Sequence, residues 1–189
     1  ACIFLLREVE VSNALLSAWQ LNHDTMELTW LLPSSKSDHL ALCTRRTWGC
    51  LCDVVGLGCP YHIAVEHKSW LMSSSFITED LTLSECMATP LFPATGGGIA
   101  NQSAVVSTFE AIGTLLGQPL VGESGIRLFG GHSARVTGAQ ALAAAGVEIN
   151  KVRILARHPG EAILRYVADA PLRSLRSDLG VCSARNTLG

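Results

Sequence analysis

The sequence lacks any uninterrupted apolar run of about 18 residues, the length that a membrane-spanning helix needs. It also lacks the basic-then-apolar layout of a signal peptide at its start. We therefore expect a soluble, intracellular protein without a membrane partner, nuclear in a eukaryote or cytoplasmic in a bacterium. Disorder is excluded, because 48% of the 189 residues are hydrophobic. The chain begins Ala1-Cys2-Ile3 without Met, so we expect a fragment of a longer protein.

The seven cysteines cannot all pair, because their number is odd. Without a secretory signal, reduced thiols are expected and structural disulfides are not. Cys50, Cys52, Cys59 and His62 are residue types that bind zinc, but the Cys-x-Cys spacing is not a standard one. The sequence therefore favours buried, reduced thiols and no metal, with zinc as the weaker alternative.

Glycine-rich segments at 96–98 and 130–131 are not followed by the Lys-Ser/Thr pair of a nucleotide-binding loop. They are interpreted as turns, and no cofactor is expected.

The formal net charge of −2 hides an uneven distribution. Residues 1–126 carry five basic and twelve acidic residues, a net charge of −7, whereas residues 127–189 carry nine basic and four acidic residues, a net charge of +5. A polyanion would bind at the basic end. A solvated, arginine-rich helical surface is the alternative.

Hydrophobic periodicity predicts a mainly helical α+β fold with one small antiparallel sheet. Residues 26–32 alternate, and residues 40–52 are rich in Leu, Thr, Trp and Cys, so the two segments are predicted to form a hairpin near residues 26–52 with Lys36 close to its tip. Residues 73–98 are expected to be mostly loop with at most one short helix. Helices are predicted over 4–19, 60–72, 99–117, 133–145, 149–157 and 160–168.

The most informative segment is Gly130-Gly131-His132-Ser133-Ala134-Arg135 at the start of a predicted helix. His132 and Arg135 are three residues apart, near the positive end of that helix. Arginine forks and a helix start suit an oxyanion such as a phosphodiester under attack. A capping histidine with a surface arginine is the alternative for this pair in isolation.

The segment resembles the His-x-x-Arg motif of the tyrosine recombinases, the phage integrase family. As in that family, a glycine (Gly146), a second histidine (His158) and a tyrosine (Tyr166) follow. Tyr166 lies eight residues after His158, one fewer than is usual in the family. Upstream, the resemblance includes Leu6-Arg7-Glu8-Val9-Glu10, Ser35-Lys36-Ser37-Asp38 and Leu91-Phe92-Pro93, in the family's order.

This resemblance implies a catalytic domain over residues 1–170, a tail over 171–189 that packs on a neighbouring subunit, and an N-terminal DNA-gripping domain outside this chain. It implies that Tyr166 attacks phosphorus, that Arg7 and Arg135 clamp the phosphate, that His132 and His158 assist, and that Lys36 protonates the leaving group.

The implied reaction is DNA cleavage and rejoining by a tetramer on duplex DNA, as in a mobile-element integrase, without metal or ATP. A topoisomerase of type IB and a domesticated domain that binds without cutting are the alternatives. Candidate contacts to the DNA backbone are Arg45, Arg46, Lys151, Arg153 and Arg157.

Overall fold

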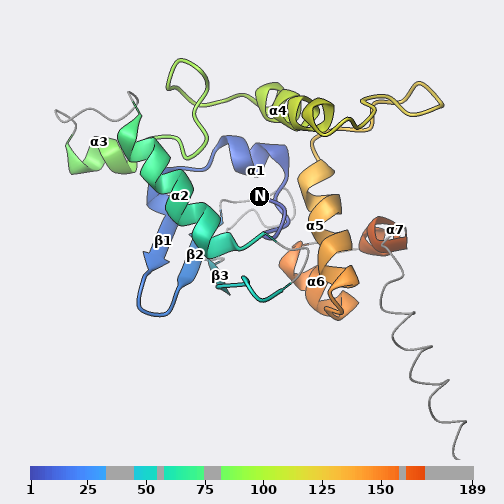
Figure 1. The fold of residues 1–189 in the computed structure, drawn as a ribbon, viewed down its shortest axis with the longest axis horizontal. Coiled ribbons are helices and arrows are strands. Elements are labelled where there is room, and N and C mark those ends of the chain that lie inside the picture. The colour runs from blue at the N-terminus through green and yellow to red at the C-terminus, as the bar shows by residue number, and fades with distance from the viewer. Residues whose placement is uncertain (33–44, 55–57, 75–81, 158–160, 169–189) are drawn as a thin grey trace, which may run out of the picture. The chain divides into compact units, whose positions relative to one another are not determined.

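A computed structural model describes residues 1–32, 45–54, 58–74, 82–157 and 161–168. The chain forms two compact units. The larger unit comprises Leu6–Ser133, and the smaller comprises Ala1–Leu5 with Ala134–Gly189. Figure 1 shows the order of the elements along the chain.

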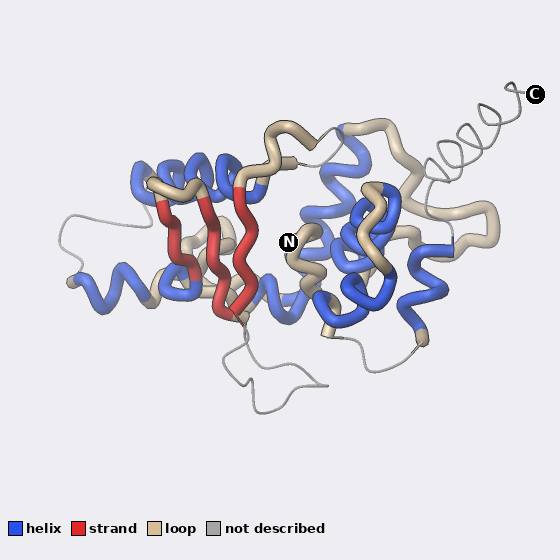
Figure 2. Tube along the Cα trace, turned by 90° about the horizontal axis from the view of Figure 1, so that it is seen from below, coloured by secondary structure: helices blue, strands red, loops and turns tan. Residues whose placement is uncertain are grey.

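The larger unit contains a three-stranded antiparallel sheet in the order β1-β2-β3 (Figure 2). Its strands are β1 (Trp19–Asn22), β2 (Glu27–Leu31) and β3 (Arg45–Gly49). Strand β2 alternates as predicted, because Leu28, Trp30 and the following Leu32 are buried. The pairing of Glu27 with Gly49 confirms the hairpin, whereas Lys36 lies outside the described residues.

Helix α2 (Pro60–Ser73) begins at the predicted proline and contacts all three strands. Its buried face is formed by Tyr61, Ala64 and Leu71. Ile63 does not share this face, since it is 55% exposed.

The Leu91-Phe92-Pro93 segment belongs to the core around the sheet. Leu91 is fully buried, and its carbonyl accepts a hydrogen bond from His67 Nε2 at 2.7 Å. The Phe92 ring lies 6.2 Å from each of the rings of Trp19 and Trp30. The Leu91-Phe92-Pro93 segment is thus a packing element in the described structure.

The predicted helix over residues 4–19 is wrong in most of its length. Only α1 (Glu8–Ser12) is α-helical there, and a 3-10 turn η1 (Leu16–Ala18) leads into β1. The cause is non-local, because Leu91 N–H donates to the Ala14 carbonyl at 2.7 Å and Leu16 N–H donates to the Thr89 carbonyl at 2.9 Å. These bonds hold the chain in an extended bridge where periodicity predicts a helix.

Two further helices complete the larger unit. Helix α3 (Leu83–Met87) is the short helix expected within residues 73–98. Helix α4 (Gln102–Leu115) is capped by the Asn101 side chain, which accepts from Ala104 N–H at 2.8 Å. It packs against α1 and ends near Gly117, whose φ is +68°.

The regular secondary structure in the described part of the smaller unit is all helical. It contains α5 (Ser133–Ala144, of which Ser133 belongs to the larger unit), α6 (Ile149–Leu155) and α7 (Ala162–Ala168). All three helices were predicted, as was the glycine stop after α5, where Gly146 has a φ of +83°. The core of this unit includes Leu142, Val152, Ala156 and Ile163.

The fold is therefore mainly helical with one small antiparallel sheet, as predicted. Among the helices of the described residues, none has the length and hydropathy needed to cross a membrane.

Candidate functional site

Arg7 stands immediately before α1, where it acts as the N-cap residue. Its backbone N–H donates to Glu10 Oε2 at 2.8 Å, and its Nη2 atom lies 3.6 Å from Glu10 Oε1. Glu10 is only 1% exposed, so this carboxylate is a fixed partner for the guanidinium. The Nε atom of Arg7 is buried and has no hydrogen-bond partner among the described residues.

His132 lies in the larger unit, on the loop that enters α5, and it is exposed. The loop is held against α1, because Glu8 N–H donates to the Gly131 carbonyl at 3.0 Å. Gly130 N–H also donates to Ser133 Oγ at 2.8 Å. Glu8 follows Arg7 and Gly131 precedes His132, so residues adjacent to each of them are hydrogen-bonded. Arg7 and His132 themselves are 125 positions apart in the sequence.

Arg135 is a buried residue of the smaller unit, with 4% of its surface exposed. Its Nε atom donates to the Leu5 carbonyl at 2.7 Å. Leu5 itself has a φ of +53°, which is uncommon for a residue other than glycine. A charged side chain is buried only with partners, and this bond supplies one of them.

Tyr166 lies on α7 in the smaller unit and is partly exposed. Lys36 and His158 fall outside the described residues. Arg7 and His132 belong to one unit, and Arg135 and Tyr166 belong to the other. The convergence of all six residues on one phosphate therefore stays a prediction.

The candidate DNA-contacting residues are distributed over both units. Arg45 is exposed at the start of β3, an edge strand, and Arg46 is partly exposed beside it. Lys151 and Arg153 are exposed on α6. Arg157 follows that helix with a φ of +51°. Their contact with DNA stays a prediction, as does the tail over 171–189, which is not described.

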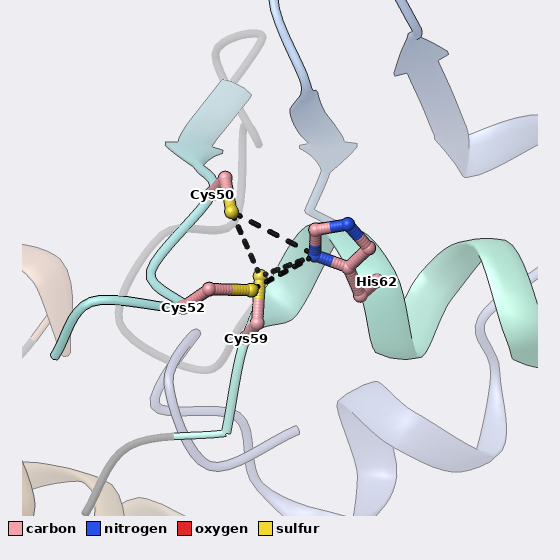
Figure 3. A group of neighbouring side chains, drawn as sticks. All are labelled: Cys50, Cys52, Cys59 and His62. Atoms are coloured by element: carbon pink, nitrogen blue, oxygen red, sulfur yellow. Dashed lines mark hydrogen bonds between the residues drawn. The ribbon is translucent and has the colours of Figure 1, made fainter. Parts of the chain in front are cut away.

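Cys50, Cys52, Cys59 and His62 form a cluster in the larger unit, between the end of β3 and the start of α2. Figure 3 shows their sulfur atoms and the Nδ1 atom of His62 pointing toward one another. The four ligand atoms all lie within 4.8 Å of each other. The interpretation of these cysteines as buried does not hold for Cys52, which is exposed, or for Cys50, which is partly exposed.

The thiols of this cluster have divergent proton affinities. Hydrogen bonding with Cys50 and Cys59 is the main cause that raises the pKa of Cys52 to about 12. Partial burial is the largest single effect and raises the pKa of Cys59, but hydrogen bonds with His62, Leu51 and Cys50 together outweigh it and lower the pKa to about 6. The environment of Cys59 thus favours a thiolate.

Sequence reasoning missed Glu8, which it named only as a member of the Leu6–Glu10 motif. A side chain at Gly131 would collide with the Glu8 carboxylate. The glycine before His132 therefore lies directly against the Glu8 carboxylate of α1, which would have to move to admit a side chain there. The adjacent glycines before His-x-x-Arg were the signal that another segment packs closely there. The sequence did not identify Glu8 as the residue that packs against them.

No protein-family model matches the sequence, and no curated protein matches it. Among solved structures, the crystal structure of XerA recombinase is similar to this chain, with a TM-score of 0.58 and 14% sequence identity. The match covers 93% of this chain and 53% of the XerA recombinase chain, so this chain spans about half of that protein's length. The likeness shows that this chain has a tyrosine recombinase-like fold.

Proposed function

We propose that this chain is the catalytic region of a site-specific DNA recombinase that acts through a phosphotyrosyl intermediate. The observation that carries the proposal is a His132-x-x-Arg135 segment at the start of α5, in a chain with the fold of XerA recombinase. The loop of this segment is hydrogen-bonded to the residue after Arg7. The resemblance assigns catalytic roles to all three residues.

Arg7 and Arg135 are proposed to bind the non-bridging oxygens of the scissile phosphate. Their environments support the proposal, because Glu10 fixes Arg7 and the Leu5 carbonyl fixes Arg135. A buried donor without a partner, such as Nε of Arg7, costs about 1–3 kcal/mol. A phosphate oxygen is the kind of acceptor that would remove this cost, most strongly when charge develops on it.

In the proposed reaction the Tyr166 oxygen forms a bond to phosphorus, and the bond from phosphorus to the 5′ oxygen breaks. His132 or His158 accepts the tyrosine proton, and Lys36 gives a proton to the leaving 5′ oxygen. The phosphodiester is replaced by a phosphotyrosyl ester of similar energy, so attack by a 5′ hydroxyl reverses the step without ATP. Duplex DNA is the proposed substrate, and a homo-tetramer on paired sites, as in integration of a mobile element, is the proposed assembly.

A covalent-trapping experiment tests this function. The probe is a library of 5′-labelled duplexes whose sequence is randomised around a nick. Cleavage near the nick releases a short fragment that diffuses away. Without this fragment the cleaved strand cannot be religated. We expect the wild-type chain to retain label on a denaturing gel. Tyr166→Phe should abolish the labelled band, because it removes only the attacking oxygen. The matched control is Tyr61→Phe, which alters the other tyrosine of the chain, whose hydroxyl bonds to His23.

The outcomes separate this proposal from its rivals. Trapping that survives in Tyr166→Phe would exclude Tyr166 as the nucleophile. DNA binding without any trapped species would indicate a domain that binds without cutting. Relaxation of a supercoiled plasmid without site preference would indicate an activity of the topoisomerase type.

A further inference from the structure

We propose that Cys50, Cys52, Cys59 and His62 form a structural zinc site that fastens the end of β3 to the start of α2. The proposed recombinase chemistry uses none of these residues. The cluster is the only group of three or more metal-ligating side chains among the described residues whose ligand atoms converge. The inference is independent of the proposed function.

Two simple pieces of backbone geometry bring the four residues together. Cys50 follows β3 directly, and Cys52 lies two positions on, in a turn that the hydrogen bond from Val54 N–H to the Leu51 carbonyl closes. Cys59 is the N-cap of α2 and His62 lies in its first turn, three positions on. Pro60 sets the start of the helix between them. Each pair thus presents two ligands in one direction.

The separations of the ligand atoms are close to those of a metal tetrahedron. A tetrahedral zinc with Zn–S bonds of about 2.3 Å requires sulfur atoms about 3.8 Å apart, and the Cys50 and Cys59 sulfurs are 3.7 Å apart. Nδ1 of His62 lies 3.7 Å from the sulfur of Cys50 and 3.2 Å from those of Cys52 and Cys59. Bond lengths for zinc imply about 3.6 Å for such pairs. The Cys52 sulfur lies within 4.8 Å of the other two sulfurs, so a shift of about 1 Å or less would seat the ion.

The ligand set favours zinc in a structural role. Three thiolates and one imidazole satisfy a tetrahedral ion completely, whereas a catalytic zinc keeps one position for water. Sulfur ligands exclude Mg²⁺ and Ca²⁺, which prefer oxygen. Leu51 N–H donates to the Cys59 sulfur at 3.3 Å, as an outer-shell partner that stabilises a thiolate ligand.

The thiols are accessible, which supports a metal over a passive role. A buried thiol is protected by packing, whereas Cys52 is exposed and Cys50 is partly exposed. A Cys50–Cys59 disulfide would require sulfurs about 2.05 Å apart, and the observed separation is 3.7 Å. Zinc would hold all three thiolates and would connect two segments separated by residues 53–58.

The test is metal analysis of the full 189-residue chain purified with zinc supplied and no chelator. We expect one zinc per chain after dialysis. Replacing it with Co²⁺ should give the intense visible bands of a tetrahedral cobalt ion and the thiolate-to-metal charge transfer of sulfur ligands. A chelator should lower the melting temperature, and added zinc should restore it.

Matched cysteine variants assign the ion to this cluster. Cys59→Ser should lose most of the bound zinc and the cobalt charge-transfer band. Cys2→Ser, which alters an exposed cysteine outside the cluster, should keep both. The zinc content and the cobalt spectrum of the wild-type chain test the proposal without any variant, so poor folding of a variant leaves that test intact. A wild-type chain that holds no zinc, gives an octahedral cobalt spectrum or contains a Cys50–Cys59 disulfide would overturn the proposal. Failure here would leave DNA trapping by Tyr166 unaffected, and the reverse also holds.

Discussion

Arg135 shows how one side chain can serve both the fold and a proposed reaction. Its Nε atom donates a hydrogen bond to the Leu5 carbonyl. The two Nη groups lie in the same guanidinium plane as Nε. A guanidinium fixed at one nitrogen loses little further entropy when it binds a phosphate. Lysine, with a single flexible ammonium group, could not divide its donors in this way.

Removal of the Arg135 side chain should destabilise the protein even without DNA. Arg135→Ala deletes a charge-assisted hydrogen bond and leaves a cavity at a position that is 4% exposed. We expect the free energy of unfolding to fall by about 2–4 kcal/mol. Urea denaturation measures this change. The control Arg153→Ala alters an exposed arginine of α6 and should change stability by less than about 0.5 kcal/mol. Equal effects of both variants would contradict the structural role of Arg135.

Helix α5 owes its position in the smaller unit to a close approach between backbones. A Cβ atom at Gly138 would collide with the Cys2 carbonyl and would lie 2.7 Å from the Leu5 side chain. The segment Ala1–Leu5 therefore packs directly on the helix backbone, where a side chain would keep it away. Glycine lowers the intrinsic stability of a helix. Its presence at position 138 is therefore explained by the close packing of the N-terminal segment.

Gly138→Ala separates these two effects, because they have opposite signs. Helix propensity alone predicts a gain of about 0.5–1 kcal/mol, whereas overpacking against backbone costs about 1–3 kcal/mol. We expect a net loss of roughly 1 kcal/mol or more, measured as a lower midpoint in urea. Gly49→Ala in β3 is the control, because a Cβ there meets nothing within 4 Å. A stabilised Gly138→Ala variant would show that the N-terminal segment does not pack on α5.

The elements that the sequence predicted are those defined by local signals. Strand β2 alternates, α2 begins at Pro60, and α5 stops at Gly146. The region over residues 4–19 failed because its apolar spacing is helical, whereas its backbone bonds go to Thr89 and Leu91. Strand β1 (Trp19–Asn22) was not predicted, and its first residue was assigned to that helix. Periodicity reports which residues are buried and cannot report a hydrogen bond to a partner 70 or more positions away.

The candidate active site was predictable as an ordered set of residue types, and its geometry was not. The His132-x-x-Arg135 spacing is visible in the sequence, but the bond from Glu8 to the Gly131 carbonyl is not. The cysteine cluster shows the opposite case. Its spacing is non-standard, so the sequence argued against a metal, and only the fold shows that a strand end and a helix start converge. Ligand sets assembled from different elements are recognised by position in space.

At the scale of the whole molecule, the uneven charge predicts where duplex DNA binds. The net charge of +5 over residues 127–189 includes Lys151 and Arg153, which are exposed on α6. If they contact phosphates, each releases counterions, and the slope of log affinity against log salt should shrink by about 0.9 per residue removed. We expect the double variant Lys151→Ala/Arg153→Ala to reduce the slope by about 1.8, measured by fluorescence anisotropy with a random-sequence duplex. Lys68→Ala, an exposed lysine on α2 in the acidic part of the chain, should leave the slope unchanged. An unchanged slope in the double variant, or an equal loss per residue in Lys68→Ala, would show that the exposed basic residues of α6 do not contact the DNA backbone.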